Sequence, residues 1–502
     1  MKRQTYSPRS GVYYHIFVPF FRDGNGDGVG DLRGIIQTLD YFNDGKGGGL
    51  GVKGLWLSPV HPSPSYHKYD ITDFYAIDPA FGTMEDFETL VAEANKRGIG
   101  IVLDLIFNCS SHLHPWFLKA QEDASSPEAG YYYLDGSEDT RYLDRDAVWN
   151  ELPAWHFPEK GRGYIGIYSE VMPDFNFNSP ALREECLKIA RFWLKKGVSG
   201  FRLDSAMHLF STAEVEEGVS HHAKNVAWWR EFRTECRRLR PDVFLVGEVW
   251  DTPAVRALYY GGLDSSFHFY LGDGIAAFLD GKEDAAQFAK RMENSCLAAS
   301  LIDPAYTDSP FLSNHDMLRY AEEHPDRDKL KQAAAIYLTM EGTPFVYYGE
   351  ELGMHAAKED TCPYFPAYDY LGRARTAFDW GEEEGMCSAR FQKGYLSPSL
   401  KEQKQDCGSL YRLYERLIRL RNADRALTHG RFSPLPCPDP RVLSYALEYG
   451  AARTEVYHNA GSSPFPLPLG GDAVDLMTGE HIPTAQNRRA LPPGHSAIVC
   501  YG

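Results

Sequence analysis

Residues 197–208 read GVSGFRLDSAMH, and this stretch decides the fold. A helix is expected to end at Gly197, and the apolar run 198–203 that follows is typical of a short strand. Arg202, Asp204 and His208 come at or just after its end. Side chains alternate along a strand, so Arg202 and Asp204 point to the same face. Parallel α/β barrels keep their active sites at the carboxyl ends of their strands. The stretch therefore predicts either such a site or a buried Arg–Asp ion pair with no further role.

The composition limits the class of protein. With 502 residues and 43% hydrophobic content, the chain can bury a large core, and we expect two or three domains. A formal net charge of −17 argues against a nucleic-acid surface, which needs clustered Lys and Arg. No stretch approaches the length of a membrane span. We therefore expect neither nucleic acid nor membrane as a partner.

The N-terminal residues and the cysteines suggest a reducing compartment. The first seventeen residues contain no apolar segment of signal-peptide length. The nine cysteines are odd in number and scattered, without a C-x-x-C pair, which favours neither a disulfide scaffold nor a zinc site. The simplest interpretation is a cytoplasmic protein with reduced thiols.

Strand and helix signals alternate along most of the chain. Residues 83–97 predict a helix that begins with a Thr83–Asp86 capping box and stops at Gly98, and Ser179-Pro180 opens another. Buried parallel strands read as short apolar runs, and eight of them are present. They are residues 12–17, 55–57, 99–107, 198–203, 244–249, 266–270, 311–314 and 344–349. This rhythm predicts a (β/α)₈ barrel.

Two segments interrupt or follow the barrel. Between residues 109 and 176 the chain is rich in Pro, Gly, Tyr and Asp with little periodicity, and it is too long for an ordinary loop. After a helix at 410–421, short alternating strands at 442–448, 454–458 and 496–501 indicate a small all-β domain. We therefore predict barrel segments 1–108 and 177–425, an inserted domain 109–176 and a C-terminal domain 426–502.

The loop DGNGDGVGD at 23–31 is a candidate metal site. Its oxygen-bearing side chains stand at alternate positions, and the glycines between them permit a tight curl around one hard cation. Closely packed acids without a cation repel one another, which favours bound Ca²⁺ over a Gly/Asp turn with no metal. The expected ligands are the side chains of Asp23, Asn25, Asp27 and Asp31 and the carbonyl of Val29.

Acids stand at several predicted strand ends. Asp104, Asp204, Glu248 and Asp316 all follow apolar runs. Each alone could be an ion pair or a helix cap, but together they suit glycoside hydrolysis. That reaction needs one ionised carboxylate to attack the anomeric carbon and one protonated carboxyl to serve the leaving oxygen. Arg202 would keep Asp204 ionised, and the apolar residues flanking Glu248 would favour its protonated form.

The motifs at residues 104–108, 200–204, 247–250 and 313–316 resemble, in order, the four conserved regions of the α-amylase family, glycoside hydrolase family 13. The resemblance covers nearly the whole chain. It implies a (β/α)₈ barrel with an inserted B domain and a C-terminal antiparallel β-sandwich. It also implies Asp204 as nucleophile, Glu248 as general acid/base and Asp316 as the third acid. The substrate-binding residues it implies are Tyr69, Asp70, Arg202, His208 and His315, and it strengthens the calcium expectation.

Four features refine or disturb the resemblance. Residues 172–176, MPDFN, resemble the family's fifth region in a form intermediate between the oligo-1,6-glucosidase and neopullulanase groups. Ser205 stands where relatives preferring α-1,6 bonds tend to carry Val, so both features indicate α-1,4-glucans. Cys109 replaces the usual His of the first region, and Met207 stands where many amylases carry Lys. Cysteine is a poor hydrogen-bond donor, so one sugar contact is lost or passes to water.

The sequence thus predicts a retaining hydrolase of maltooligosaccharides or starch fragments. A neopullulanase or cyclomaltodextrinase, an α-glucosidase, a glucan transferase or a non-catalytic sugar-binding protein on the same scaffold remain alternatives. The neopullulanase alternative is weakened because the chain begins at the first expected barrel strand. The oligomeric state is open, with a monomer favoured.

Overall fold

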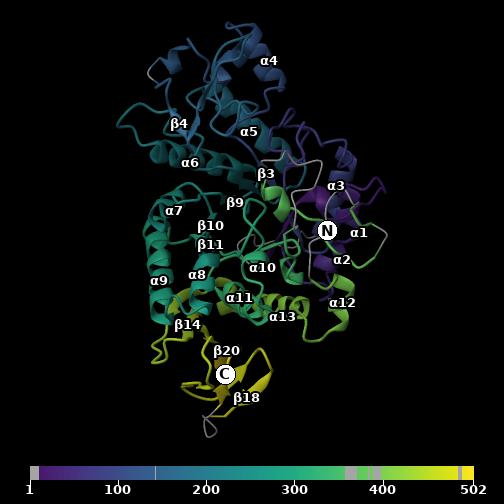
Figure 1. Ribbon diagram of the computed structural model, residues 1–502, viewed down its shortest axis with the longest axis vertical. Coiled ribbons are helices and arrows are strands. Elements are labelled where there is room, and N and C mark those ends of the chain that lie inside the picture. Colours follow the sequence, from purple (N-terminus) through teal and green to yellow (C-terminus); the bar gives the residue numbers. More distant parts are fainter. Residues whose placement is uncertain are drawn as a thin grey trace. The chain divides into compact units, whose positions relative to one another are not determined.

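The computed structural model describes residues 11–141, 143–356, 370–382, 385–387, 397–483 and 489–501 (Figure 1). The chain divides into two compact units. The first unit contains residues 1–55, 93–99 and 267–502, and the second contains residues 56–92 and 100–266.

A nearly closed barrel of eight parallel strands is the central element of the fold. Its strand order is β11-β10-β9-β8-β3-β2-β1-β12. In chain order the strands are β1 (Tyr13–Ile16), β2 (Gly54–Leu57), β3 (Gly100–Leu105), β8 (Gly200–Leu203), β9 (Phe244–Gly247), β10 (Ser265–Phe267), β11 (Thr307–Ser309) and β12 (Phe345–Tyr347). The predicted (β/α)₈ barrel is confirmed.

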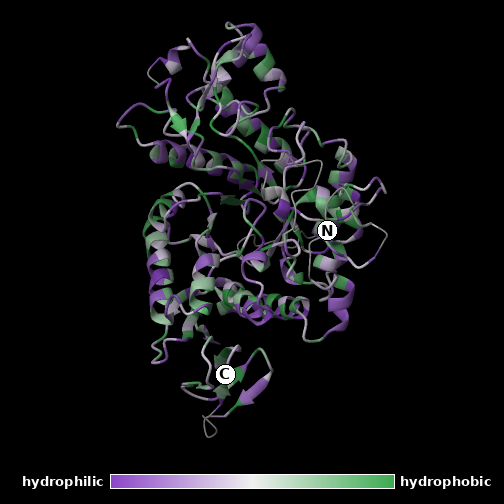
Figure 2. Ribbon diagram, viewed as in Figure 1, coloured by the Kyte–Doolittle hydropathy of each residue, from purple (hydrophilic) through white to green (hydrophobic). Residues whose placement is uncertain are grey.

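The helices around the strands begin as local sequence signals direct. In α3 (Met84–Lys96), the Thr83–Asp86 capping box forms in both directions at 2.9 and 3.1 Å. In α5 (Pro180–Lys195), the Ser179 side chain accepts from the backbone N–H of Leu182. The other long helices are α6 (His221–Leu239), α9 (Ala285–Ile302), α11 (Arg327–Thr339) and α13 (Leu410–Ala423). Figure 2 shows hydrophilic and hydrophobic residues interspersed along α9, as expected of a helix with one covered face.

The remaining helices are short. They are α1 (Leu32–Gln37), α2 (Leu39–Phe42), α4 (Pro115–Glu122), α7 (Pro253–Tyr259), α8 (Leu271–Leu279), α10 (Tyr320–Glu323), α12 (Leu400–Gln405) and α14 (Arg425–His429). No helix in the described ranges is both long and apolar enough to cross a membrane.

The seventh barrel strand differs from the prediction. Residues 311–314 lie just beyond it, and β11 is the polar segment Thr307–Ser309. All three residues of β11 are buried, and Asp308 pairs there with His268 Nδ1 at 2.8 Å. The prediction was wrong because it searched for an apolar run, whereas this strand satisfies its buried polar side chains through neighbours distant in sequence.

The inserted segment has more regular structure than its sequence suggests. It contains helix α4 and two small antiparallel pairs, β4 (Val148–Trp149) with β5 (Leu152–Pro153) and β6 (Trp155–His156) with β7 (Tyr164–Ile165). A small apolar core holds the segment together. Its buried members are Tyr133, Ala154, Trp155, Ile165, Ile167 and Ala213.

The C-terminal strands form an antiparallel domain, drawn in yellow in Figure 1. Its main sheet has the order β13-β14-β15-β20-β17-β18, and β16 pairs with β19. These strands are β13 (Arg431–Pro434), β14 (Val442–Tyr449), β15 (Ala452–Asn459), β16 (Phe465–Pro466), β17 (Ala473–Asp475), β18 (Glu480–Ile482), β19 (Ala490–Leu491) and β20 (Ser496–Tyr501). One apolar cluster includes residues of the main sheet together with Phe465 and Leu491 of the small pair. The predicted antiparallel domain is confirmed; the domain boundaries drawn from the sequence stay a prediction.

Candidate active site

Three neighbouring strands of the second unit bring one group of charged side chains together. Asp104 in β3 pairs in register with Arg202 in β8. Beyond the strands, the N–H of Asp204 donates to the last carbonyl of β3, and that of Glu248 donates to the last carbonyl of β8, both at 3.0 Å. The parallel register therefore places these four residues at the carboxyl ends of β3, β8 and β9, where the sequence predicted them.

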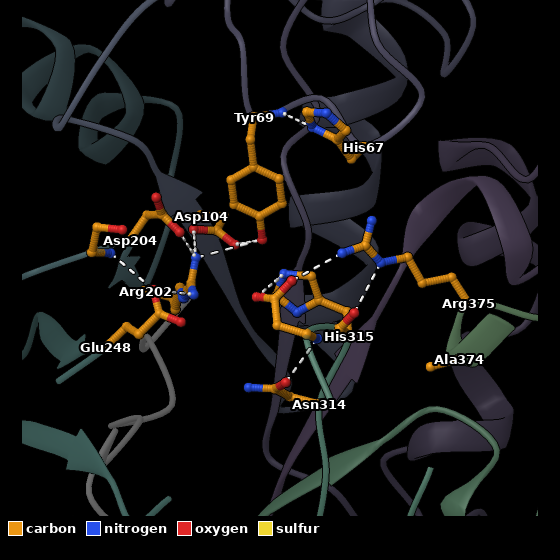
Figure 3. A network of polar contacts seen from close by, with 12 residues as sticks. His67, Tyr69, Asp104, Arg202, Asp204, Glu248, Asn314, His315, Ala374 and Arg375 are labelled. Atoms are coloured by element: carbon orange, nitrogen blue, oxygen red, sulfur yellow. Dashed lines mark hydrogen bonds and ion pairs between the residues drawn. The ribbon is translucent and has the colours of Figure 1, made fainter. Parts of the chain in front are cut away.

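Arg202 is the centre of this group (Figure 3). Its side chain is 1% exposed. Nη1 binds both Asp204 Oδ1 and Asp104 Oδ1, the latter at 2.8 Å, and Nη2 binds Glu248 Oε2 at 2.9 Å. One guanidinium thus holds three carboxylates, which suits the planar, multidentate geometry of arginine.

Aromatic side chains complete the surroundings of Arg202. The guanidinium lies over the rings of Trp56 and Tyr69, at 5.1 and 5.9 Å from their centroids. Asp104 Oδ2 accepts from Trp56 Nε1 at 3.2 Å and from the Tyr69 hydroxyl at 3.0 Å. Asp104 therefore fixes the Tyr69 ring beside the arginine.

The electrostatics of the group follow from burial and the excess of acids. Burial acts to lower the pKa of Arg202, but the neighbouring carboxylates of Asp104 and Glu248 outweigh it, so the pKa is raised well above its usual value. Burial raises the pKa of Asp104, while Arg202 and Tyr69 oppose that shift. Three carboxyl groups around one cation favour retaining a proton within the group. Such a group can supply both an ionised nucleophile and a proton donor.

The surroundings of Glu248 differ from the expectation. Trp250 is 45% exposed and therefore does not enclose the carboxyl group in an apolar pocket. The partners of Glu248 Oε2 are polar: Arg202 and the backbone N–H of Ser205, which donates at 2.9 Å. The prediction considered only sequence neighbours, whereas strand register supplies the actual contacts.

A second group lies in the first unit, after β11. His315 is completely buried, and its Nε2 lies 3.0 Å from Asp316 Oδ2. Arg375 binds the same aspartate through Nη2 at 2.9 Å and donates from Nε to the carbonyl of His315 at 2.9 Å (Figure 3). Two contacts from one arginine fix both the backbone and the carboxylate of this pair.

Arg375 is a residue of this group that the sequence did not single out. It is 5% exposed, and its guanidinium lies 5.2 Å from the centroid of the Phe17 ring. The segment around it reads LGRARTAFDW, which has no motif of its own. Nothing in the sequence could have selected it over the neighbouring Arg373.

Asp70 and His208, two more of the predicted substrate-binding residues, also contact other groups of the protein. Asp70 is 3% exposed, and its Oδ1 accepts from Ser63 Oγ at 2.6 Å and also from Ser65 Oγ. The carbonyl of His208 accepts from Asn108 Nδ2 at 2.5 Å. Burial lowers the pKa of His208 to about 4, so its ring is neutral near pH 7. Its part in binding a sugar stays a prediction, as do the roles of Tyr69, Asp70, Arg202 and His315.

Cys109 is a buried structural residue here. It is 1% exposed and forms a backbone bridge with Asp174 of the inserted segment. Burial raises the pKa of its thiol well above the usual value. The nearby His114 caps α4, because its Nδ1 accepts from the Trp116 N–H at 3.0 Å.

The candidate calcium loop is held largely by its own backbone. Asp23 accepts from the N–H groups of Gly26 and Gly28, both at 2.7 Å. Asp31 caps α1 through Oδ1, while its Oδ2 is buried and makes no hydrogen bond. Burial raises the pKa of Asp31, and the nearby charges of Asp23 and Asp27 act in the same direction. Within the described ranges, no three His, Cys, Asp or Glu side chains are grouped to hold a metal ion.

The family profile described as "Alpha amylase, catalytic domain" matches residues 15–430. The chain belongs to the α-amylase family. It is 34% identical to Alpha-amylase 3 of Dictyoglomus thermophilum over 505 residues, covering 98% of this chain and 93% of that protein. An oligo-1,6-glucosidase of Parageobacillus thermoglucosidasius is 29% identical, covering 90% of each. The crystal structure of an alpha-amylase from H. orenii superposes with a TM-score of 0.85 at 36% identity, covering 98% of this chain and all of that one.

The family membership establishes the general activity. The chain is a family 13 enzyme that acts on α-glucans as a hydrolase or a transferase, and its substrate is an oligosaccharide or polysaccharide. Which bond is cleaved, and what accepts the glycosyl group, is a finer question.

Proposed function

We propose that this α-amylase family enzyme hydrolyses α-1,4-glucosidic bonds in maltooligosaccharides or starch fragments, through a covalent glycosyl-enzyme intermediate. The observation that carries the proposal is the shared arginine: Asp204 and Glu248 bind the two terminal nitrogens of Arg202. One guanidinium favours the short carboxyl separation that retaining glycosidases use, rather than the wider one that accommodates an intervening water.

The reaction would proceed in two steps, with Asp204 as nucleophile and Glu248 as acid and then as base. Asp204, ionised beside Arg202, attacks the anomeric carbon while the Glu248 carboxyl protonates the departing glycosidic oxygen. Glu248 then takes a proton from water, which attacks the same carbon and releases Asp204. Asp316 would stabilise the transition state as the third carboxylate, and the sugar would contact Tyr69, Asp70, Arg202, His208 and His315.

Two sequence features support α-1,4 bonds as the target. Ser205 stands where relatives preferring α-1,6 bonds tend to carry Val. The MPDFN stretch at 172–176 resembles the intermediate group, whose members are mostly α-amylases or maltooligosaccharide-cleaving enzymes. A neopullulanase or cyclomaltodextrinase, an α-glucosidase and a glucan transferase are the competing activities, and a non-catalytic sugar-binding protein is the competitor without turnover. We place the enzyme in the cytoplasm on its cysteine pattern.

Product chromatography tests the proposal. Maltoheptaose, soluble starch, pullulan, β-cyclodextrin and isomaltose would be incubated with the wild type, with Asp204→Asn as the blank. We expect shorter maltooligosaccharides from maltoheptaose and starch and no product from the blank. Glucose as the sole product would identify an α-glucosidase, longer products a transferase, and cleavage of isomaltose an α-1,6 enzyme. Sugar binding without turnover would refute the catalytic proposal.

We also propose that the loop at 23–31 binds Ca²⁺. The buried Asp31 Oδ2 without a hydrogen bond, close to two further carboxylates, fits the oxygen preference of this cation. Asn25 and the carbonyl of Val29 would join Asp23, Asp27 and Asp31 as ligands. The cation would stabilise the folded loop and take no part in the bond cleavage.

Thermal unfolding with and without calcium tests this second proposal. After dialysis against chelator, Ca²⁺ at about 100 times its Kd would stabilise the fold by about 2.7 kcal/mol. Asp27→Asn should reduce the shift. An identical melting temperature for the wild type with millimolar Ca²⁺ and with chelator would contradict the proposal.

A further inference from the structure

Ser205 connects the inserted segment to Glu248, and all the residues concerned lie in the second unit. Its backbone N–H donates to Glu248 Oε2 at 2.9 Å. Its Oγ lies 2.6 Å from the hydroxyl of Tyr168, which belongs to the inserted segment. A continuous path of two hydrogen bonds therefore runs from Tyr168 to the carboxyl group that we propose as the acid/base.

The backbone of Ser205 is strained. Its φ is 45°, in the left-handed region that residues other than glycine rarely adopt. Such a conformation persists only where the surroundings hold it. The bond to Tyr168 is the side-chain contact that anchors Ser205. Without it, we expect the residue to relax and its N–H to turn away from Glu248.

Tyr168 is itself well anchored. It packs against the apolar core of the inserted segment, and its ring lies 4.8 Å from that of Trp149 in an edge-on arrangement. Burial raises the pKa of the Tyr168 hydroxyl well above its usual value, and the nearby Asp204 charge acts in the same direction. The hydroxyl therefore stays neutral throughout the working pH range and serves as a fixed hydrogen-bond partner.

The two contacts on Glu248 fall on the same oxygen. Arg202 Nη2 and the Ser205 N–H both bind Oε2. Both donors use Oε2, so Oε1 is the oxygen available for proton transfer in the proposed reaction. Two contacts on Oε2 also restrict the rotation of the carboxyl group, and this orients Oε1 toward the leaving group in the proposed reaction.

We propose that Tyr168 is a positioning residue for Glu248, acting through Ser205, so that the inserted segment orients the proton donor just after the barrel strand β9. The proposal rests on the function proposed above. The proton moves from Glu248 Oε1 to the glycosidic oxygen as the bond to the anomeric carbon breaks, and returns to Oε1 from the attacking water. Tyr168 touches neither the sugar bond nor the transferred proton.

Comparison of two leaving groups tests this assignment. An alcohol leaving group such as the sugar of maltoheptaose needs a well-placed proton, whereas 2-chloro-4-nitrophenol departs from an aryl α-maltotrioside with little assistance. The variants are Tyr168→Phe, Ser205→Ala and the double variant, and kcat/KM is measured because it reports the step that breaks the glycosidic bond. Tyr164→Phe is the matched control, since that hydroxyl also belongs to the inserted segment but donates to the carbonyl of Glu170 at 2.5 Å.

We expect each single variant to lower kcat/KM on maltoheptaose by about tenfold, because a small misplacement of a catalytic group is costly. On the aryl substrate the loss should stay below about twofold, with both substrates unaffected in Tyr164→Phe. The double variant should lose about as much as one single variant, since both changes break one path.

Equal losses on the two substrates, no loss in either single variant, or additive losses would each overturn the positioning role while leaving the proposed function intact. A wild type that cleaves neither substrate would refute the proposed function, and the positioning role with it.

Discussion

Two buried arginines, Arg202 and Arg421, show how differently the same side chain is used in the two units. Arg202 is 1% exposed and binds three carboxylates. Arg421 in α13 is 0% exposed and binds only backbone carbonyls, those of Leu338 and Met340 at 2.8 Å and that of Gly342. Carboxylates raise the pKa of Arg202 far above its usual value, whereas burial lowers the pKa of Arg421 to about 10.

Under the proposed function, the difference separates a chemical role for Arg202 from a structural role for Arg421. The carbonyls around Arg421 lie at the end of α11 and just beyond it, where a helix leaves its last carbonyls without partners. Within the part of the chain that the structure describes, Arg421 satisfies them without a direct ion pair to a carboxylate. Arg202 instead holds three carboxylates at a buried position, a costly arrangement that is typical of catalytic sites.

The largest expected effect is the loss of activity in Arg202→Lys. A lysine keeps the charge but cannot hold Asp104, Asp204 and Glu248 at once, because it lacks the forked geometry. We expect kcat/KM on maltoheptaose to fall by about 10³-fold. Steady-state kinetics on folded protein, verified by circular dichroism, provide the measurement. A kcat/KM of Arg202→Lys within about tenfold of the wild type would contradict the catalytic role that distinguishes Arg202 from Arg421.

Arg421→Lys should reduce stability and leave activity unchanged, the opposite of Arg202→Lys. Leaving several buried carbonyls without a donor should lower the free energy of unfolding by about 3 kcal/mol, while folded enzyme keeps its kcat/KM. Urea unfolding followed by tryptophan fluorescence gives the first quantity. A loss of activity as large as that of Arg202→Lys would show that Arg421 supports the site.

Glu350 extends the comparison to a buried acid without a cation. Its carboxyl group accepts from the hydroxyls of Tyr337 at 2.9 Å, Tyr414 at 3.2 Å and Ser313 at 3.2 Å, and burial raises its pKa from 4.5 to about 8. Between these values the folded chain keeps a proton that the unfolded chain has released. The stabilising contribution is therefore complete below pH 4.5 and is lost as pH rises through 8.

In Glu350→Gln this titration is absent. The difference in unfolding free energy between the wild type and the variant should change by about 1 kcal/mol per pH unit between pH 5 and 7, in favour of the variant at the higher pH. Urea unfolding of both proteins at pH 5, 6 and 7 provides the test. A difference independent of pH would show that Glu350 is ionised in the folded chain.

The smallest effect is expected from removing one hydroxyl donor to this acid. Tyr337→Phe deletes a single hydrogen bond to a neutral carboxyl group and should cost about 0.5–1 kcal/mol in unfolding free energy. The matched variant Tyr306→Phe removes a buried hydroxyl away from Glu350. If Tyr337→Phe cost several times more, Glu350 would have to be charged.

The sequence reveals the parts of the site that are encoded locally. Apolar runs ending in Asp104, Asp204 and Glu248 mark the strand ends, and Ser179-Pro180 marks the start of α5 through its own capping chemistry. The sequence fails at β11, where buried polar residues replace the apolar signal, and at Arg375, which no motif distinguishes. The prediction that Trp250 would enclose the Glu248 carboxyl group was wrong, because residues adjacent in sequence need not be in contact.

By itself the sequence determined the barrel, the C-terminal antiparallel domain and the family, because alternating periodicity, caps and short motifs act over a few residues. The tertiary structure decided the partners. Asp104 and Arg202 meet across almost a hundred residues through strand register, and Tyr168 reaches Ser205 from the inserted segment. The strained backbone of Ser205 likewise has no local signal. Such contacts depend on how distant segments pack, and short stretches of sequence do not determine that packing.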